Sequence, residues 1–151
     1  MAPFLSARKI VKQFPGVMAN DHVDFDVERG EIHALLGENG AGKSTLMQIL
    51  YGLYSRDSGE ILVDGSPVEL ATPAESIQAG IGMIHQEFML VRKFSVTENI
   101  IMGLKDDDHG GRLDLATAAA RISELSTSYG LQVDPDAIIE HLPVGVQQRV
   151  E

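Results

Sequence analysis

The pattern of apolar and polar positions indicates strands in the first part of the chain, followed by a helix. Residues 23–27 alternate strictly between apolar and polar, as in a strand with one buried face. Residues 32–36 form a short, mainly apolar run between Gly30 and Gly37, which predicts a buried strand. From Lys43 the apolar positions follow the spacing of one helix face: Leu46, Met47, Ile49, Leu50 and Leu53.

A hairpin and one more strand are predicted after this helix. Asp64-Gly65 stands between the apolar segments 60–63 and 68–70, and this dipeptide is typical of a two-residue hairpin turn. Residues 81–85 are a further strand candidate. The front of the chain is therefore expected to be mixed α/β with antiparallel β elements.

Capping signals mark the helices of the remaining chain. Thr72, with Pro73 and Glu75 after it, forms a capping box that predicts a short helix ending at Gly80. Ser95 and Glu98 repeat the capping box, for a helix to about Gly103. The remaining expectations are a loop over 106–111, a helix over 114–129 and a short helix over 134–141. The face expected to be buried on the 114–129 helix consists of Leu115, Ala118, Ile122, Leu125 and Tyr129.

Composition narrows the class of protein. The chain has 151 residues, 44% of them hydrophobic, which is enough for a packed core. There is no cysteine, no apolar run long enough to span a bilayer and no signal-peptide layout at the N-terminus, so we expect a soluble intracellular protein. Twelve basic and 22 acidic residues give a net charge of −10, which argues against nucleic acid as a partner.

The strongest chemical signal is the phosphate loop, residues 37–44. Its sequence GENGAGKS fits the pattern G-x-x-x-x-G-K-[ST] between a predicted strand and a predicted helix. The glycines let successive backbone N–H groups point at phosphates, and the helix beginning at Lys43 adds its positive dipole end. Lys43 is expected to reach the β- and γ-phosphates of ATP, and the Ser44 hydroxyl to bind Mg²⁺.

Four features in this order resemble the ATP-binding subunit of ABC importers. They are residues 37–45 (GENGAGKST), residues 82–90 (GMIHQEFML), residues 142–150 (LPVGVQQRV) and Phe14. The resemblance covers nearly the whole chain. It implies a P-loop ATPase core over residues 1–90 and a helical signature subdomain over residues 91–151, both partial. The residues around Phe14 and in the signature segment are similar to those of sugar and nucleoside importers.

The resemblance also implies roles for single residues. Phe14 would stack on adenine, and Gln86 would contact Mg²⁺ or the attacking water and act with Lys43 in catalysis. Gly145 would offer a backbone donor to ATP on a second subunit. The nucleotide-binding residues would be Phe14, Gly37, Asn39, Gly40, Ala41, Gly42, Lys43, Ser44, Thr45 and Gly145, with Ser44 and Gln86 at the metal.

The same resemblance implies a partner and a place in the cell. A subunit of this family couples ATP binding and hydrolysis to solute transport through a membrane permease. It would lie on the inner face of the cell membrane and pair with a second ATP-binding subunit. Two alternatives are a nucleotide-dependent docking fragment that does not hydrolyse ATP and a DNA-repair or chromosome ATPase. The negative charge disfavours the second alternative.

The sequence departs from the family pattern in two places. The signature has Pro143, Val144 and Val146 where the family has Ser, Gly and Gln, and proline supplies neither a hydroxyl nor an N–H group. The magnesium Asp, the catalytic Glu and the His that follow the signature in the family cannot be placed after Glu151. We therefore expect the front part of a longer subunit, with little or no activity alone, that either self-associates or is only marginally stable.

Several candidate residues also have a structural interpretation. Phe14 could fill the core, and Gln86 could be an ordinary polar residue at a strand end. His33 is expected to be structural, whereas His85 could line the site. Asp64, which ends an apolar run, is interpreted as a hairpin turn rather than the missing magnesium ligand. The acidic run 106–109 is interpreted as a solvated loop rather than a metal site.

Overall fold

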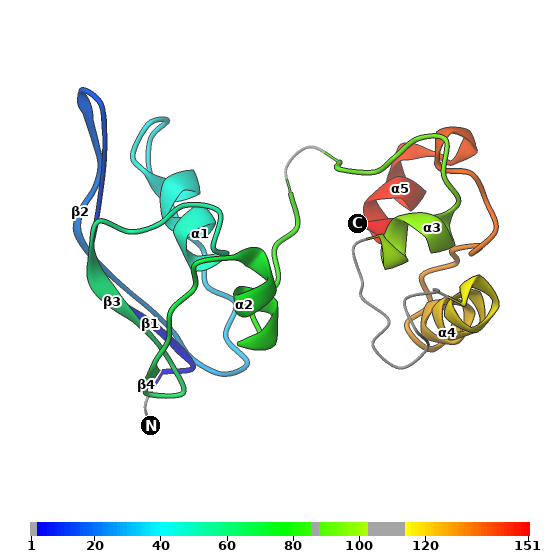
Figure 1. Ribbon diagram of the computed structural model, residues 1–151, viewed down its shortest axis with the longest axis horizontal. Coiled ribbons are helices and arrows are strands. Elements are labelled where there is room, and N and C mark those ends of the chain that lie inside the picture. The colour runs from blue at the N-terminus through cyan, green and yellow to red at the C-terminus, as the bar shows by residue number, and fades with distance from the viewer. Residues whose placement is uncertain (1–2, 86–87, 103–113) are drawn as a thin grey trace. The chain divides into compact units, whose positions relative to one another are not determined.

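The computed structural model describes residues 3–85, 88–102 and 114–151. These residues divide into two compact units, Met1–Met83 and Ile84–Glu151, which are described separately. The first unit combines a sheet with two helices, and the second is helical (Figure 1).

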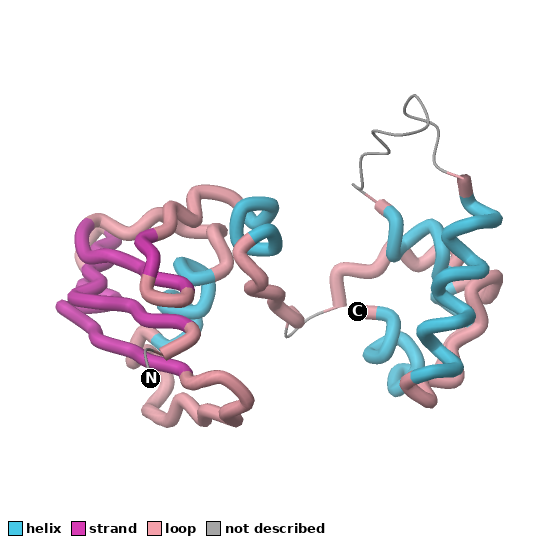
Figure 2. Tube along the Cα trace, turned by 90° about the horizontal axis from the view of Figure 1, so that it is seen from below, coloured by secondary structure: helices cyan, strands magenta, loops and turns pink. Residues whose placement is uncertain are grey.

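In the described residues, the sheet of the first unit is antiparallel with strand order β2-β1-β3-β4 (Figure 2). Strand β1 spans Leu5–Phe14, and β2 spans Val17–Val27. Strand β3 spans Ser58–Val63, and the short β4 spans Ser66–Pro67. The turn between β3 and β4 has left-handed φ angles of 50° at Asp64 and 75° at Gly65. The predicted hairpin is confirmed, although its second strand is shorter and begins two residues earlier than expected.

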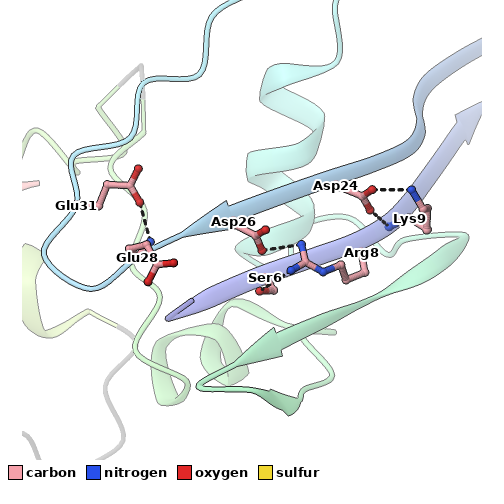
Figure 3. Close-up of polar contacts among 7 residues, drawn as sticks. All are labelled: Ser6, Arg8, Lys9, Asp24, Asp26, Glu28 and Glu31. Atoms are coloured by element: carbon pink, nitrogen blue, oxygen red, sulfur yellow. Dashed lines mark hydrogen bonds and ion pairs between the residues drawn. The ribbon is translucent and has the colours of Figure 1, made fainter. Parts of the chain in front are cut away.

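Ion pairs tie β1 to β2 on the exposed face of their hairpin (Figure 3). Arg8 and Asp26 are 2.6 Å apart, and the Asp24 carboxylate accepts hydrogen bonds from both the backbone N–H and Nζ of Lys9. Lys9 has a φ of 50°, and the pairing register shifts between Ala7 and Ile10. Asp24 therefore stabilises a local irregularity in β1.

Helix α1, Lys43–Leu50, packs its predicted apolar face against the sheet. Leu46, Ile49 and Leu50 are buried, whereas Leu53 lies beyond the helix end and is exposed. The rest of this core comes from strands β1 and β3 and from a residue three positions after β4: Leu5, Ala7, Ile10, Ile61 and Leu70. The packing of α1 places the phosphate loop, which leads into it, at the edge of the sheet.

The strand predicted over residues 32–36 is wrong. These residues have no regular secondary structure, and Ile32 and Leu36 are 99% and 89% exposed. A buried parallel strand needs hydrogen-bonding neighbours on both sides. The described strands all belong to the antiparallel sheet, so none pairs with this segment. Residues 81–85, also expected as a strand, are likewise irregular in the structure.

Helix α2, Pro73–Gln78, has the capping box that was predicted. The Thr72 hydroxyl accepts from the N–H of Glu75, while the Glu75 carboxylate accepts from the N–H of Thr72. Gly80 follows with a φ of 84°, which ends the helix as expected.

The second unit contains helices α3 (Val96–Ile101), α4 (Leu115–Ser128) and α5 (Val144–Val150) and the 3₁₀ turn η1 (Ile139–His141). Helix α3 begins at the predicted capping box of Ser95 and Glu98, and α4 begins at Asp114. The helix expected to begin at Asp134 is wrong. A turn occupies residues 135–136, and within residues 134–141 only the 3₁₀ turn η1 is helical. The buried core of this unit consists of Val96, Ile122, Val133, Ile139 and Val150.

The buried face of α4 differs from the predicted one. Ile122 is buried, but Leu115, Leu125 and Tyr129 are 50%, 40% and 75% exposed. Ser126 takes the second buried position because its hydroxyl donates to the carbonyl of Val133 and accepts from the N–H of that residue. The hydroxyl thus satisfies both backbone groups of a buried residue, which an apolar side chain could not do.

Candidate functional site

The phosphate loop connects the irregular segment after β2 to the first turn of α1. Gly40 and Gly42 have left-handed φ angles of 85° and 82°, which favour glycine. Gly42 is the N-cap of α1, and no described side chain caps this helix. The first-turn N–H groups are therefore available for an anion. Gly37, Asn39, Gly40 and Ala41 are exposed, so the loop is accessible to a ligand.

The Lys43 side chain folds back along the loop. Its Nζ donates to the carbonyls of Gly37 and Glu38, at 2.7 Å each. The N–H of Ala41 also donates to the Glu38 carbonyl at 3.2 Å. These bonds hold a positive charge next to the backbone that curls around it. Of the two hydroxyl residues that follow, Ser44 is exposed on the first turn of α1, and Thr45 is half-buried.

Strand β2 supports the loop from behind. A Cβ atom placed on Gly42 would lie 2.0 Å from the carbonyl oxygen of Ala19 and 2.9 Å from Nδ2 of Asn20. Nδ2 of Asn20 donates to the Gly42 carbonyl at 3.2 Å. The second glycine of the motif is therefore required by close packing as well as by its φ angle.

Asn20 is a residue that the sequence reasoning missed. The alternation of residues 23–27 places odd-numbered side chains inward, so Asn20 would be expected to face outward. The pairing of β1 with β2 shifts by one residue between Ile10↔Val23 and Lys12↔Asn20, and His22 in this stretch has a φ of 49°. This irregularity turns Asn20 inward, where it is 4% exposed. The local sequence signal of this irregularity is a polar residue that precedes a change in the alternation of apolar and polar positions.

Phe14 lies at the end of β1, next to the hairpin turn. Its ring is half-buried and meets the ring of Tyr54 edge to face, with 5.4 Å between centroids. Nζ of Lys12 lies 5.5 Å from the Phe14 centroid. Phe14 is absent from the buried core of the described residues, so the structure does not place it as a core filler.

Asp57 holds the end of β1 beside Phe14. Its carboxylate accepts from the N–H of Gln13 at 2.6 Å and from Nζ of Lys12 at 3.0 Å. The hydrogen bond from Gln13, and then that from Lys12, lower the pKa of Asp57 below its ordinary value. The ionised carboxylate therefore fixes both the strand end and the ammonium group near the Phe14 ring.

Gly145 lies in the first turn of α5, in the second unit. It is exposed, and no described atom lies within 4 Å of where a Cβ would stand. Pro143 is the N-cap in an extended conformation, without a side-chain cap among the described residues. Nε2 of Gln147 donates to the carbonyls of Ile139 and Leu142 at 3.2 and 2.8 Å, which anchors the chain just before α5.

The remaining candidates from the sequence are Gln86, His85, the acidic run 106–109, His33 and Asp64. Gln86 and the acidic run 106–109 lie outside the described residues, and His85 is half-buried beside Gln86. His33 contacts the Glu31 carboxylate at 2.8 Å and the Phe25 ring edge to face, which agrees with a structural role. Asp64 lies in the hairpin turn, as predicted, and its carboxylate also accepts a hydrogen bond from Arg29.

Comparison with known sequences gives one family. The family model described as ABC transporter matches residues 20–151. The glucose import ATP-binding protein TsgD13 of Haloferax volcanii is 49% identical over 99% of this chain and 32% of its own length. The guanosine import ATP-binding protein NupO of Bacillus subtilis is 51% identical over 94% of this chain and 28% of its own length. The chain thus spans less than a third of the length of these relatives.

Comparison with solved structures supports the fold. The chain resembles cbiO1 of Clostridium perfringens, part of the ABC transporter complex cbiONQ, with a TM-score of 0.73 and 24% identity over 99% of this chain and 59% of that one. MJ1267, an ATP-binding cassette in its ADP conformation, gives a TM-score of 0.75 and 23% identity over 99% of this chain and 62% of that one. The predicted α/β class of an ATPase cassette is confirmed. No helix in the described residues is long and apolar enough to cross a membrane.

Proposed function

The chain belongs to the ABC transporter family, and from this premise we propose that it binds Mg·ATP through the phosphate loop as the nucleotide-binding part of an import ATPase. The observation that carries the proposal is the loop itself. Two left-handed glycines precede an uncapped helix, and Lys43 lies within reach of the loop carbonyls. A positive charge beside a helix N-terminus without a side-chain cap suits a polyphosphate.

The residues of the loop divide the work of holding the nucleotide. Lys43 would leave its loop carbonyls for the β- and γ-phosphates, because a phosphate oxygen is a stronger acceptor than a neutral carbonyl. The exposed Ser44 hydroxyl would hold Mg²⁺, which would screen the phosphate charge. The N–H groups of residues 39–42 would cradle the phosphates, with that of Ala41 exchanging its bond to the Glu38 carbonyl for a phosphate oxygen. Gly37 would open the loop, and Thr45 would reach the α-phosphate.

Two residues outside the loop complete the proposed site. Phe14 would stack on the adenine, since its ring is half-buried at a strand end rather than enclosed in the core. Gln86 is proposed as a Mg²⁺ and water contact on the resemblance alone. Gly145 would serve ATP held by a second subunit, which its exposure permits.

We propose transport of a sugar or nucleoside as the purpose of ATP use. The relatives are named as importers of glucose, guanosine and ribose. The partners would be a membrane permease, with the chain on the inner face of the membrane, and a second ATP-binding domain. The exposed Ile32 and Leu36 also support self-association of this chain, which light scattering at micromolar concentration would detect.

Turnover is a separate expectation from binding. An intact subunit of this family would hydrolyse ATP, whereas we expect this 151-residue chain to bind ATP and release phosphate slowly. Lys43 and Ser44 hold phosphate and metal, but a positioned base contributes a further factor of roughly 10²–10⁴. A phosphate-release assay on the chain, with ordinary turnover as its result, would contradict this expectation. Ordinary turnover would also exclude the alternative of a docking fragment that does not hydrolyse ATP.

Titration calorimetry tests the site directly. Ser44→Ala should reduce the gain in ATP affinity that Mg²⁺ provides, because the hydroxyl ligand is lost. Ser128→Ala, at the end of α4 in the second unit, serves as the matched control. Phe14→Ala should weaken ATP, ADP and GTP by a similar factor, since stacking tolerates different bases. Equal ATP affinity for the wild type and Phe14→Ala would remove Phe14 from the site.

A further inference from the structure

A buried asparagine contacts the phosphate loop from the strand behind it. Asn20 is 4% exposed, and its Nδ2 donates to the carbonyl of Gly42, the residue that opens α1. The identity of the amide atoms follows from the partner, because a carbonyl oxygen accepts and only Nδ2 can donate. One side-chain hydrogen bond thus reaches the peptide at which the loop becomes a helix.

The Gly42 peptide is a sensitive point of the loop. Gly42 has a φ of 82°, and this left-handed turn sets the direction of the N–H of Lys43 and of the next amides. The carbonyl of Ala19 would lie 2.0 Å from a Cβ at this position, so the backbones of β2 and the loop are in close contact. The Ala19 carbonyl limits how closely the Gly42 backbone approaches β2, and the hydrogen bond from Asn20 holds the Gly42 carbonyl.

The side-chain oxygen of Asn20, Oδ1, makes this residue unfavourable for the stability of the fold. Its Oδ1 is buried, and no described residue donates a hydrogen bond to it. A buried polar atom without a partner destabilises the folded state, so an apolar side chain at this position would avoid that cost. The position nevertheless carries an asparagine, whose one satisfied contact is with the loop that holds the motif.

We propose that Asn20 is a positioning residue for phosphate binding: it holds the Gly42 peptide so that the loop amides are oriented before the ligand arrives. Without it, part of the binding free energy would be used to order the loop. This inference rests on the proposed function, because it assigns Asn20 to the same phosphate site. It also makes β2 a link between two parts of the site, since the strand begins three residues after Phe14.

A purely structural role makes the opposite forecast. If Asn20 served stability, its removal would lower the melting temperature and leave affinity per folded molecule unchanged. If it positions the loop, Asn20→Leu removes an unpaired buried atom and a loop contact together. The affinity of the folded chain for phosphate should then fall, whatever the change in melting temperature. The two roles therefore differ in the affinity per folded molecule.

The experiment measures Mg·ATP and Mg·tripolyphosphate binding by calorimetry on the wild-type chain, Asn20→Leu and Asn20→Ala, with melting temperatures for each. The smaller Ala variant guards against a leucine that fits poorly. We expect roughly three- to tenfold weaker binding of both ligands in both variants, the range of one net hydrogen bond. Asn99→Leu is the matched control. It removes an asparagine whose amide bonds Val91 and Ser95 in the second unit, so it should lower the melting temperature but not the affinity.

The outcomes separate this inference from the proposed function. Tripolyphosphate lacks a base, so equal losses for the two ligands place the effect on phosphate rather than adenine. Affinities within twofold of wild type in both Asn20 variants, after correction for the folded fraction, would overturn the inference. Failure of the wild-type chain to bind either ligand would instead overturn the proposed function.

Discussion

The phosphate loop and the signature segment both lead into a helix whose first turn lacks a side-chain cap, yet the two regions are built differently. Helices α2, α3 and α4 each begin at a side chain that accepts from a first-turn N–H, namely Thr72, Ser95 and Asp114. In the described residues, α1 begins at Gly42 and α5 at Pro143 without such a bond. The two helices proposed to face phosphate are thus the two described α-helices without a side-chain cap, although at α5 the N–H of Val146 donates to the Pro143 carbonyl at 2.8 Å.

The difference between the regions lies in what surrounds the open turn. At α1, Lys43 provides a positive charge. The Ala19 carbonyl lies close to Gly42, and Asn20 donates a hydrogen bond to the Gly42 carbonyl. At α5, Gly145 is exposed, with no described atom within 4 Å of a Cβ position. The phosphate loop is therefore supported by the strand behind it, whereas the proposed signature donor at Gly145 stands in the open. This contrast predicts opposite responses to the same kind of mutation.

The largest effect is expected for Gly42→Ala. An alanine at this φ costs about 1–2 kcal/mol, and contact with the Ala19 carbonyl adds about 1–3 kcal/mol of overpacking. Gly40→Ala is the matched variant, because its φ is also left-handed but no described atom lies within 4 Å of its Cβ position. Thermal unfolding should show the greater loss for Gly42→Ala. Equal losses would mean that β2 does not support the loop.

Lys43→Ala should have the next largest effect, on binding rather than on folding. Removing a charged donor to phosphate costs about 1.5–3 kcal/mol, a loss of roughly tenfold or more in ATP affinity. Calorimetry measures the affinity, with Lys93→Ala as a control, since Lys93 pairs with Glu140 in the second unit. Unchanged ATP affinity in Lys43→Ala would show that the phosphate loop is assigned wrongly.

Acid should weaken both units. Hydrogen bonds from Lys9 and from Arg8 lower the pKa of Asp24 and Asp26 from 3.8, and bonds from Ser95 and Lys93 lower the pKa of Glu98 and Glu140 from 4.5. The unfolded chain therefore binds each proton first, and the stabilisation is lost as pH falls through the folded pKa. The pKa of Glu31 in the sheet unit is also lowered from 4.5, so both units should begin to weaken as pH falls below 4.5, and the sheet unit should lose further stability below pH 3.8. Amide exchange measured for each unit would contradict this expectation if protection in either unit were unchanged below pH 3.8.

The smallest effect is expected for Gly145→Ala. The position is helical and open, so alanine fits and favours the helix by up to about 1 kcal/mol. The backbone N–H is kept, and the affinity of the monomeric chain for ATP should not change. A clear loss of ATP affinity in this variant would place the signature in the chain's own site.

Local chemistry made part of the fold predictable. The caps at Thr72, Ser95 and Asp114 and the Asp64-Gly65 turn each depend on a few neighbouring residues, and the structure has them all. The phosphate loop belongs to the same class, since its glycines and lysine act within one turn. These features follow from sequence because their hydrogen bonds close between residues that are close along the chain.

Features that depend on distant partners were not predictable in this way. The apolar run 32–36 has the composition of a buried strand, but a strand forms only beside another, and Ile32 is exposed here. Which side of α4 is buried depends on Val133, whose backbone binds Ser126. Asn20 turns inward because a shift in pairing changes the phase of β2. Its contact with Gly42 joins residues 22 positions apart, which periodicity does not reveal.

The most direct test of the account follows backbone amides during a titration with Mg·ATP. The ¹⁵N-labelled chain would be observed by NMR at concentrations where it is monomeric. The account predicts large, saturable shifts at Gly40, Gly42 and Lys43, none at Gly145, and a weaker affinity at the same amides in Asn20→Leu. Unchanged amides in the phosphate loop, or the largest shifts in the second unit, would contradict the claim that this loop holds the nucleotide.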